Sequence, residues 1–306
     1  STKSPSSAAS DVYKRQGKTK VLTSRIAHII KKNKAFPNQI LAVTFTNKAA
    51  KEMQLRVSKL LRKDATGLPW LGTFHSISAK LLRKHADAVG LKSNFSIIDQ
   101  DDQVRLIKNI CKAENVDIKK ISPKFILAII DKWKNKGFYP QDVILKRKDP
   151  LEKNFLSIYK IYQEKLVNLN SADFSDLILH TLKIFEKYTD IAQLYSKKFK
   201  YILVDEYQDT NFIQSEWLRH LSGHNKNICC VGDDDQSIYS WRGAEIKNFL
   251  EFDKVYKNTK VIRLEKNYRS TQNILSVASK LIENNQNRVG KTLFTNHDDG
   301  ELVSLS

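Results

Sequence analysis

Short apolar runs rich in β-branched residues alternate with helical patterns along much of this chain, and this alternation limits the fold more than any other feature. The runs are residues 39–46, 71–74, 201–205, 227–231 and 260–264. Between the first two, and directly after residue 17, apolar residues recur at the spacing of an amphipathic helix. Apolar strands that alternate with helices are typical of a parallel sheet covered by helices. The sequence therefore predicts an α/β fold.

Residues 98–198 interrupt the alternation. Four amphipathic stretches follow one another there with no strand pattern between them: DDQVRLIKNICK, PKFILAIIDKWKNK, FLSIYKIYQEKL and FSDLILHTLKIF. A helical insertion into one sheet domain explains this order better than two successive domains do. We therefore predict an all-helical subdomain over residues 98–198, inserted into a discontinuous α/β domain.

The charge balance favours a polyanionic partner. Lysine and arginine total 52 against 33 acidic residues, which leaves a net charge of +19, and such an excess is typical of proteins that bind nucleic acid. An anionic membrane is the weaker alternative, because no apolar run approaches the ~20 residues of a spanning helix. Three cysteines are too few for a disulfide framework or a zinc cluster, so we expect reduced thiols in a cytoplasmic protein.

The first chemical signal is Gly17-Lys18-Thr19 at the start of a predicted helix. In a phosphate-binding loop, backbone N–H groups and the helix N-terminus hold phosphates, the lysine reaches the β- and γ-phosphates, and the threonine hydroxyl binds Mg²⁺. The full pattern also needs a glycine five residues earlier, where this chain has Val12, so the tripeptide alone is a weak signal. Residues 1–16 have linker composition and do not resemble the rest of the chain; we expect a non-native or unstructured leader there.

Two carboxylates, Asp205 and Glu206, directly follow an apolar run in the segment YILVDEYQDT. The carboxyl end of a strand is where an α/β sheet presents ligands to its crevice. An acid there can hold Mg²⁺, and its neighbour can orient or deprotonate an attacking water. A solvated turn is the structural alternative, but Gln208 and Asp209 make the segment unusually polar for such a turn. Together with the tripeptide above, the segment predicts a nucleotide-hydrolysing site.

A third polar segment, VGDDDQSIYSWRGA, spans residues 231–244. Gln236 is a candidate for sensing a terminal phosphate through a hydrogen bond. Trp241 on a loop could stack a base, as the aromatic residues of single-strand binders do. The spacing is equally consistent with a structural role, because Tyr239 and Trp241, two residues apart, would both face the core from one side of a strand.

These segments, in the same order, resemble those of the superfamily 1 DNA helicases of the UvrD/Rep/PcrA type. The resemblance rests on GKT, TFTNKAAKEM, GTFHS, LVDEYQDTN, VGDDDQSIYSWRGA and LEKNYRST, and it covers residues 17 to about 285. It implies a RecA-like P-loop NTPase domain (1A) over residues 17–97 and 199–275, with the helical insertion 1B over residues 98–198. Residues 276–306 would be the truncated start of a second RecA-like domain (2A).

The resemblance also implies roles for individual residues at an ATP and Mg²⁺ site and along a DNA track. Three residues would be catalytic, as base, γ-phosphate sensor and arginine finger respectively: Glu206, Gln236 and Arg269. The nucleotide would be held by Gly17, Lys18, Thr19, Lys20 and, stacked on the adenine, Tyr268. The metal would be held by Thr19 and Asp205. Single-stranded DNA would lie along Phe45, His75, Tyr239 and Trp241, with Arg242 coupling this track to the nucleotide.

The function that the resemblance implies is an ATP-dependent 3′–5′ DNA helicase, which acts on single-stranded DNA and on single-strand/duplex junctions. Two alternatives stay open: a non-motor module that binds single-stranded DNA, and the motor part of a helicase–nuclease subunit. In an intact parent the C-terminal motor domain would follow residue 306. Because the phosphate loop lacks its glycine and the second domain is incomplete, we expect the 306-residue chain alone to bind ATP poorly and not to unwind DNA.

Overall fold

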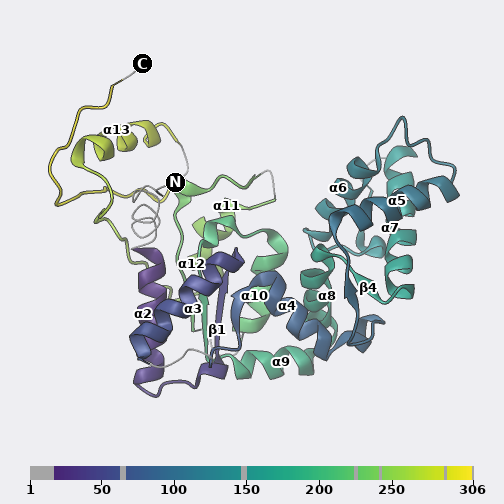
Figure 1. The fold of residues 1–306 in the computed structure, drawn as a ribbon, viewed down its shortest axis with the longest axis horizontal. Coiled ribbons are helices and arrows are strands. Elements are labelled where there is room, and N and C mark those ends of the chain that lie inside the picture. Colours follow the sequence, from purple (N-terminus) through teal and green to yellow (C-terminus); the bar gives the residue numbers. More distant parts are fainter. Residues whose placement is uncertain are drawn as a thin grey trace, which may run out of the picture.

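The main sheet contains four parallel strands. The computed structural model describes residues 17–62, 67–145, 150–223, 227–240, 243–285 and 288–304. The strands lie in the order β2-β1-β5-β6 and are β1 (Ile40–Thr44), β2 (Leu71–Thr73), β5 (Tyr201–Val204) and β6 (Ile228–Cys230). In the register, Ala42 is paired with Leu71 on one side and with Leu203 on the other. This sheet confirms the predicted α/β, RecA-like fold (Figure 1).

Helices cover both faces of this sheet and form most of the remaining structure. Their bounds are α2 (Lys18–Lys31), α3 (Asn47–Leu61), α4 (Phe74–Lys84), α5 (Gln100–Ala113), α6 (Pro123–Lys134), α7 (Pro150–Asn168), α8 (Phe174–Lys187), α9 (Thr189–Lys198), α10 (Phe212–Ser222), α11 (Ile246–Leu250), α12 (Phe252–Val255) and α13 (Gln272–Ile282). Short 3-10 turns lie at Pro37–Gln39, Ala86–Val89, Pro140–Asp142, Tyr207–Asp209 and Asp234–Gln236. Two short strands, β3 (Ser96–Ile97) and β4 (Ser171–Ala172), pair in parallel in a sheet of their own.

Alternate residues of the central strands enter different cores. The residues that pack with α2 and α3 are Ile40, Ala42 and Leu203. Those that pack with α4, α8 and α10 are Leu41, Val43, Ile202 and Val204. Successive side chains of a strand point to opposite faces, so a strand covered on both sides is apolar throughout. This burial explains why the runs in the sequence show no polar alternation.

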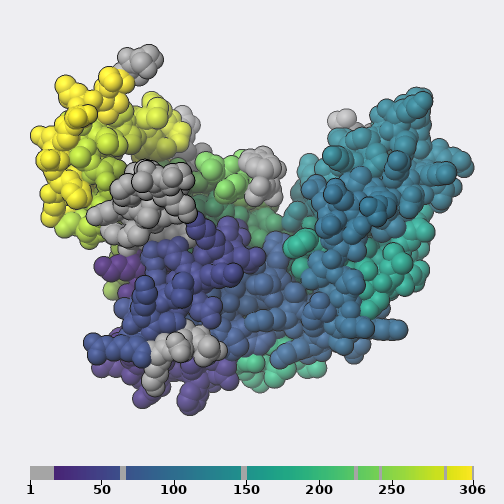
Figure 2. Space-filling view, viewed as in Figure 1, coloured from purple at the N-terminus to yellow at the C-terminus, as the bar shows by residue number. Residues whose placement is uncertain are grey.

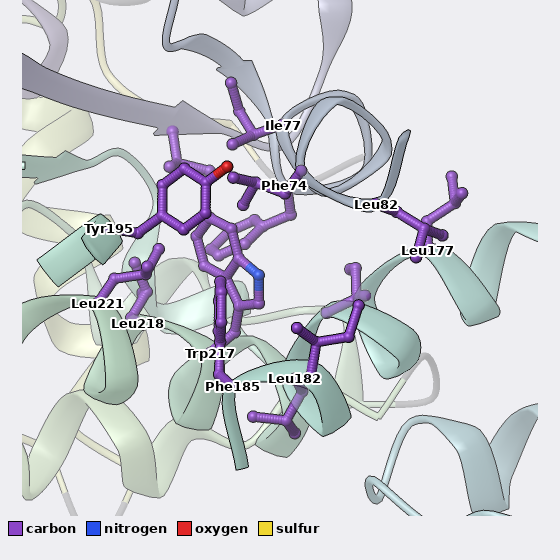
Figure 3. Packing of buried hydrophobic residues seen from close by; sticks show 14 of the residues in the cluster. Phe74, Ile77, Leu82, Leu177, Leu182, Phe185, Tyr195, Trp217, Leu218 and Leu221 are labelled. Atoms are coloured by element: carbon purple, nitrogen blue, oxygen red, sulfur yellow. The ribbon is translucent and has the colours of Figure 1, made fainter. Parts of the chain in front are cut away.

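The larger core lies between the sheet and the helices α4, α8, α9 and α10, as Figure 3 shows. Trp217 is fully buried there, and its ring lies edge-on to that of Phe74 with 5.9 Å between the centroids. The indole nitrogen is satisfied, because Nε1 donates to Thr181 Oγ1 at 3.1 Å. Aromatic side chains of this size contribute much of the apolar area that holds α8 and α10 against the sheet.

The helical insertion has its own core, which α5, α6 and α7 build around residues such as Ile130 and Tyr159. Helices α8 and α9 do not contribute to that cluster, since Phe185 and Tyr195 pack in the core of the sheet domain. The sequence pattern placed the insertion at residues 98–198 and showed no strand in it, whereas β4 lies within this range. The packing favours a shorter insertion that ends near α7, and this division remains our interpretation.

Residues 260–264 do not form the strand that their apolar pattern predicts. Val261 and Ile262 are 65% and 70% exposed, and β6 is the last strand of the main sheet in the described part of the chain. A β-branched run becomes a strand only where a neighbouring strand offers hydrogen bonds, and here the next pairing along the chain is an isolated bridge between Lys266 and Phe294. The prediction of a strand was therefore wrong.

The insertion and the C-terminal segment, by which we mean residues 265–285 and 288–304, rise on two sides of the sheet domain. They leave a hollow between them (Figure 2). Cys111 is buried, Cys229 and Cys230 are half-buried, and all three carry free thiols, as the sequence led us to expect. Among the residues that the structure describes, no helix is long and apolar enough to cross a membrane.

Candidate nucleotide and DNA site

Four of the segments singled out in the sequence begin where the four parallel strands end. Residues 45–50 follow β1, residues 74–76 follow β2, residues 205–209 follow β5 and residues 231–236 follow β6. Parallel strands present their carboxyl ends at one edge of a sheet, and α/β proteins bind ligands at that edge. The fold therefore gathers these four segments into one region.

The N-terminus of α2 reaches the same edge through two side chains. Lys18 Nζ lies 2.6 Å from Glu206 Oε2. Thr19 Oγ1 donates to Asp205 Oδ2 at 3.3 Å. The structure thus brings the lysine and threonine of the GKT tripeptide into contact with the two carboxylates that follow β5. The roles assigned to these four residues remain predictions, but their proximity is the arrangement that those roles require.

The carboxyl group of Asp205 is strongly perturbed by its surroundings. Only 4% of the residue is exposed. Burial, followed by the nearby Glu206 carboxylate, raises the pKa of Asp205 to about 6, although Lys18 and the hydroxyl of Thr19 act in the opposite direction. A buried carboxylate beside a hydroxyl is an all-oxygen donor set, which suits a hard divalent cation such as Mg²⁺. A cation there would compensate the unfavourable burial of the negative charge, so the residues present fit the metal that the resemblance implies.

The start of α2 is only partly described. Gly17 is the exposed residue before the helix, and an added Cβ there would meet no atom of the described residues within 4 Å. Lys20 is exposed on the first turn. Residues 1–16, and with them the expectation of a foreign leader and of a loop without its glycine, lie outside the described residues.

Glu206 has a backbone φ of 52°, in the left-handed region that non-glycine residues rarely adopt. This conformation ends β5 abruptly and starts the 3-10 turn Tyr207–Asp209. Several hydrogen bonds hold the turn; among them, Tyr207 N–H donates to Val231 O at 2.9 Å, and Asp209 N–H donates to Glu206 O at 2.9 Å. Backbone strain of this kind persists where the surroundings enforce it, and it is common at functional sites.

The turn after β6 lies against the segment after β5. The Asp233 N–H donates to Gln208 Oε1 at 3.0 Å, and Gln208 Nε2 donates to Glu206 Oε2 at 3.1 Å. Gln236, the predicted γ-phosphate sensor, is exposed and donates its side-chain amide to Asp233. Gln236 is therefore close to the carboxylate edge but is held there by its own turn.

The three carboxylates of the turn, Asp233, Asp234 and Asp235, are bound by the C-terminal segment. Arg288 forms two hydrogen bonds with Asp235, at 2.8 and 3.0 Å. Lys291 pairs with Asp233 and with Asp235. The carboxylate oxygens of the three aspartates lie within 4.8 Å of one another, a spacing that a metal ion could use, but Arg288 and Lys291 already compensate two of the three negative charges. The cluster is therefore an ion-pair anchor for the C-terminal segment.

Tyr268 and Arg269 lie on this anchored segment. Tyr268 is half-exposed, and Lys266 Nζ lies 5.3 Å from the centre of its ring. The Arg269 N–H donates to Asn267 Oδ1 at 2.8 Å. The bridge from Lys266 to Phe294 connects both residues to the part of the chain that pairs with Asp233 and Asp235. Their predicted contacts with adenine and γ-phosphate stay predictions.

The predicted DNA track begins at the ends of β1 and β2. The Phe45 ring lies edge-on to Phe74 with 5.5 Å between centroids. His75 lies edge-on to the half-exposed Phe174 at 6.0 Å, and burial lowers the pKa of His75, which favours a neutral ring. Tyr239 is 36% exposed on the segment after β6. Trp241 and Arg242, the other two predicted members, lie outside the described residues.

Sequence reasoning missed three residues of this region. Gln208 was part of the polar cluster after β5, but nothing in the local pattern indicated that it would contact the turn after β6. Arg288 and Lys291 lie in no motif that singled them out. The signal that could have found these two cations was the run of three consecutive acids in the loop after residue 232, because such a run is expected to attract cations from elsewhere in the chain.

Comparison with known proteins gives matches over the range that contains these segments. The family profile described as the UvrD/REP helicase N-terminal domain matches residues 16–257, and the profile of the UvrD-like helicase C-terminal domain matches residues 262–306. The chain is 50% identical over 292 residues to a probable DNA helicase II homologue of Rickettsia conorii. It is 45% identical over 288 residues to the ATP-dependent DNA helicase PcrA of Bacillus subtilis.

The matches cover nearly all of this chain but less than half of those relatives. The alignment with the Rickettsia protein takes in 94% of this chain and 44% of the relative, and that with the Bacillus protein 94% and 39%. Identity at this level over this length is far above what shared fold alone produces. With the geometry at the strand ends, these matches show that the chain belongs to the UvrD/Rep family of DNA helicases.

Proposed function

We propose that this chain supplies the ATP-binding half of a helicase that couples ATP hydrolysis to 3′-to-5′ translocation on single-stranded DNA. The observation that carries the proposal is the pairing of Lys18 with Glu206 and of Thr19 with Asp205 at the carboxyl edge of the sheet. The family membership supports the same reaction, since relatives are named as ATP-dependent DNA helicases.

Each of these side chains has a task at the phosphates. Thr19 and Asp205 would hold Mg²⁺, which supplies charge neutralisation at the transferred phosphoryl group when it is bound. Lys18 now neutralises Glu206; in the presence of nucleotide its ammonium group would turn to the β- and γ-phosphates. Glu206 would then be free to accept a proton from the attacking water. The exchange of partners by Lys18 ties activation of the base to arrival of the phosphate.

The DNA side of the proposal rests on charge and on aromatic rings, of which Phe45 and His75 are half-buried and Tyr239 is exposed. Phe45, His75 and Tyr239 would line the strand, together with Trp241 and Arg242. The hollow between the insertion and the C-terminal segment borders the sheet domain and gives room for a strand or a junction (Figure 2). A net charge of +19 favours the phosphate backbone of either.

One observation favours a second candidate function, a module that binds single-stranded DNA without hydrolysing ATP. Val12 stands where a phosphate loop normally has glycine. A β-branched residue resists the positive φ that such a loop demands, at ~1–2 kcal/mol per residue. Hydrolysis of ATP that is stimulated by DNA separates the two candidates.

The test is binding of a fluorescent ATP analogue to the purified chain, measured by anisotropy with Mg²⁺ and with EDTA. We expect binding that is weak but Mg²⁺-dependent, and that falls about tenfold or more in Lys18→Ala, because a charge-assisted hydrogen bond is lost. Lys31→Ala is the matched control, an exposed lysine at the other end of α2. Equal losses in both variants, or none in either, would contradict the nucleotide site.

A further inference from the structure

Gln208 is almost completely buried, with 1% of its surface exposed, although it has no assigned part in the proposed reaction. It lies two residues after the predicted base, in the 3-10 turn that follows β5. Its amide nitrogen donates to Glu206 Oε2 at 3.1 Å and to Asp209 Oδ2 at 3.3 Å. Its amide oxygen accepts the N–H of Asp233 at 3.0 Å. Every polar atom of the side chain is therefore used.

These contacts determine the orientation of the Gln208 side-chain amide, that is, which way its nitrogen and its oxygen point. Two carboxylates can only accept hydrogen bonds, and a backbone N–H can only donate one. The nitrogen of Gln208 must therefore face Glu206 and Asp209, and the oxygen must face the turn after β6. The side chain connects the predicted base directly to the backbone of residues 232–236.

The neighbouring backbone is shaped to allow this contact. A Cβ added at Gly232 would lie 2.8 Å from Gln208 Oε1 and 2.6 Å from the ring of Phe249. Real Cβ atoms do not approach other atoms so closely, so the turn can lie this near to Gln208 only because residue 232 is glycine. The close approach makes the Gln208–Asp233 contact a built feature of the fold.

We propose that Gln208 is a positioning residue, which holds the Glu206 carboxylate and couples it to the turn of residues 232–236. Lys18 and Gln208 converge on the same oxygen of Glu206, Oε2. When Lys18 turns to phosphate, as the proposed function requires, the Gln208 amide remains on that oxygen and keeps Oε1 available for water. A carboxylate without this second donor would rotate freely at the moment it is needed.

The coupling has a second end at the C-terminal segment. Asp233, whose N–H binds Gln208, also accepts hydrogen bonds from Gln236 and Lys291 through its carboxylate. A displacement of residues 288–291 would pull on Asp233 and, through Gln208, on Glu206. The orientation of the base would in this way depend on where the second domain lies.

Hydrogen exchange at the Asp233 amide tests this connection without requiring turnover. We expect Glu206→Ala to raise the exchange rate of the Asp233 N–H about tenfold, because Gln208 loses one of the two carboxylates that orient it. Glu216→Ala, which removes a glutamate paired with Arg219 on α10, is the control and should leave that rate unchanged. Peptides from β5 provide the reference for global unfolding.

A double substitution separates coupling from a general loss of stability. In Gln208→Met the Asp233 N–H is expected to exchange fast already, and Glu206→Ala should add nothing to that rate. Gln208→Asn, which keeps the amide on a shorter side chain, should behave like Gln208→Met. No change at Asp233 in Glu206→Ala alone, or equal effects of Glu206→Ala in both backgrounds, would overturn the proposal. The Glu206→Ala result decides this even where Gln208→Met does not fold.

Catalysis gives a second readout that a purely structural role would not move. In a full-length parent that also carries the second motor domain, Gln208→Met is expected to lower DNA-stimulated ATP hydrolysis about 10–100-fold while the Mg-ATP dissociation constant stays within about threefold. Equal turnover in the variant and the unsubstituted chain would contradict positioning. If Lys18→Ala did not weaken nucleotide binding, the proposed function itself would be contradicted. Failure of the positioning role and failure of the proposed function are therefore distinguishable.

Discussion

At the scale of single residues, the left-handed backbone of Glu206 is where fold and proposed chemistry meet. A φ of 52° is costly for a glutamate, at ~1–3 kcal/mol, and glycine or asparagine would adopt it with less strain. The side chain compensates through its bonds with Lys18 and Gln208. The strain is therefore retained together with a carboxylate, which is consistent with a chemical role for that carboxylate.

In a full-length parent that also carries the second motor domain, Glu206→Gln is expected to preserve Mg-ATP binding within a few-fold and to reduce DNA-stimulated hydrolysis about 10²–10⁴-fold, because an amide cannot take the proton of water. Phosphate release measures the rate, and anisotropy of the fluorescent analogue measures the binding. Glu216→Gln serves as the control. Hydrolysis at the unsubstituted rate would show that another group is the base.

Gly232→Ala is expected to lower the free energy of unfolding by about 1–3 kcal/mol, since the new methyl group overlaps Phe249 and Gln208 and forces one of them to move. Urea unfolding followed by tryptophan fluorescence measures the change. Gly67→Ala is the matched control, because its Cβ would meet Pro37 at an ordinary 3.9 Å. Equal stabilities of the two variants would mean that the turn after β6 yields at no cost.

At the scale of elements, a buried charge cluster joins the insertion to the sheet domain. Lys134, the last residue of α6, is completely buried and lies 2.7 Å from both Asp173 and Asp176 at the start of α8. Burial alone would lower the pKa of Lys134, but the two carboxylates outweigh it and hold the pKa above its ordinary value. The ammonium group is therefore charged at neutral pH.

Lys134→Met is expected to lower the free energy of unfolding by about 3–5 kcal/mol, because two buried carboxylates lose their counter-charge. Burial, and then Asp176, already raise the pKa of Asp173 to about 6. A raised carboxyl pKa contributes stability that is complete below about pH 4 and is lost as the pH rises through 6. The penalty of the substitution should therefore be larger at pH 7.5 than at pH 5, by urea unfolding. Lys132→Met, exposed on the same helix, should show neither effect.

Sequence patterns predicted the elements better than they predicted their neighbours. The runs that became β1, β5 and β6 were recognised because burial on both faces leaves an uninterrupted apolar signature. Helix α8 was recognised as a helix, and its assignment to the insertion stays a prediction, because periodicity shows which side of a helix is apolar but not what that side packs against. The prediction of a strand at residues 260–264 was wrong for a similar reason: an apolar pattern does not show whether a neighbouring strand is available for pairing.

In the candidate site, too, some contacts could be predicted from the sequence and others could not. Lys18, Thr19, Asp205 and Glu206 could be placed together from sequence because a parallel sheet gathers its carboxyl ends. The contact of Gln208 with Asp233, and that of Arg288 with Asp235 across 53 residues, depend on how two loops approach in three dimensions. No local spacing encodes such an approach.

At the scale of the whole molecule, the excess of positive charge sets how the chain should meet DNA. Affinity for single-stranded DNA is expected to fall steeply with salt, because neutralised phosphates release counterions. The logarithm of the binding constant should decrease linearly with the logarithm of the salt concentration. Trp241→Ala should weaken binding by ~1–3 kcal/mol at every salt concentration and leave the slope unchanged, since a neutral ring releases no ions. Fluorescence anisotropy with a labelled oligothymidylate measures both quantities.

The control for that series is Phe36→Ala, an aromatic residue that is 73% exposed and precedes β1, at the opposite end of the strands from the site. It should alter neither affinity nor slope. Unchanged affinity in Trp241→Ala would place that ring in the core instead of on the track, and a flat salt dependence would contradict an electrostatic mode of binding.

The pairing of β1 with β5 also constrains the order in which parts of this protein can fold during synthesis. These neighbours at the centre of the sheet lie roughly 160 residues apart in the chain, so their hydrogen bonds close a very long loop. On the ribosome β1 emerges early and has only β2 to pair with, while the insertion, which has a core of its own, can fold in the meantime. Only when β5 has left the exit tunnel can the apolar strand β1 be covered on its second edge. Until then it is a segment that chaperones would bind and that neighbouring nascent chains could capture.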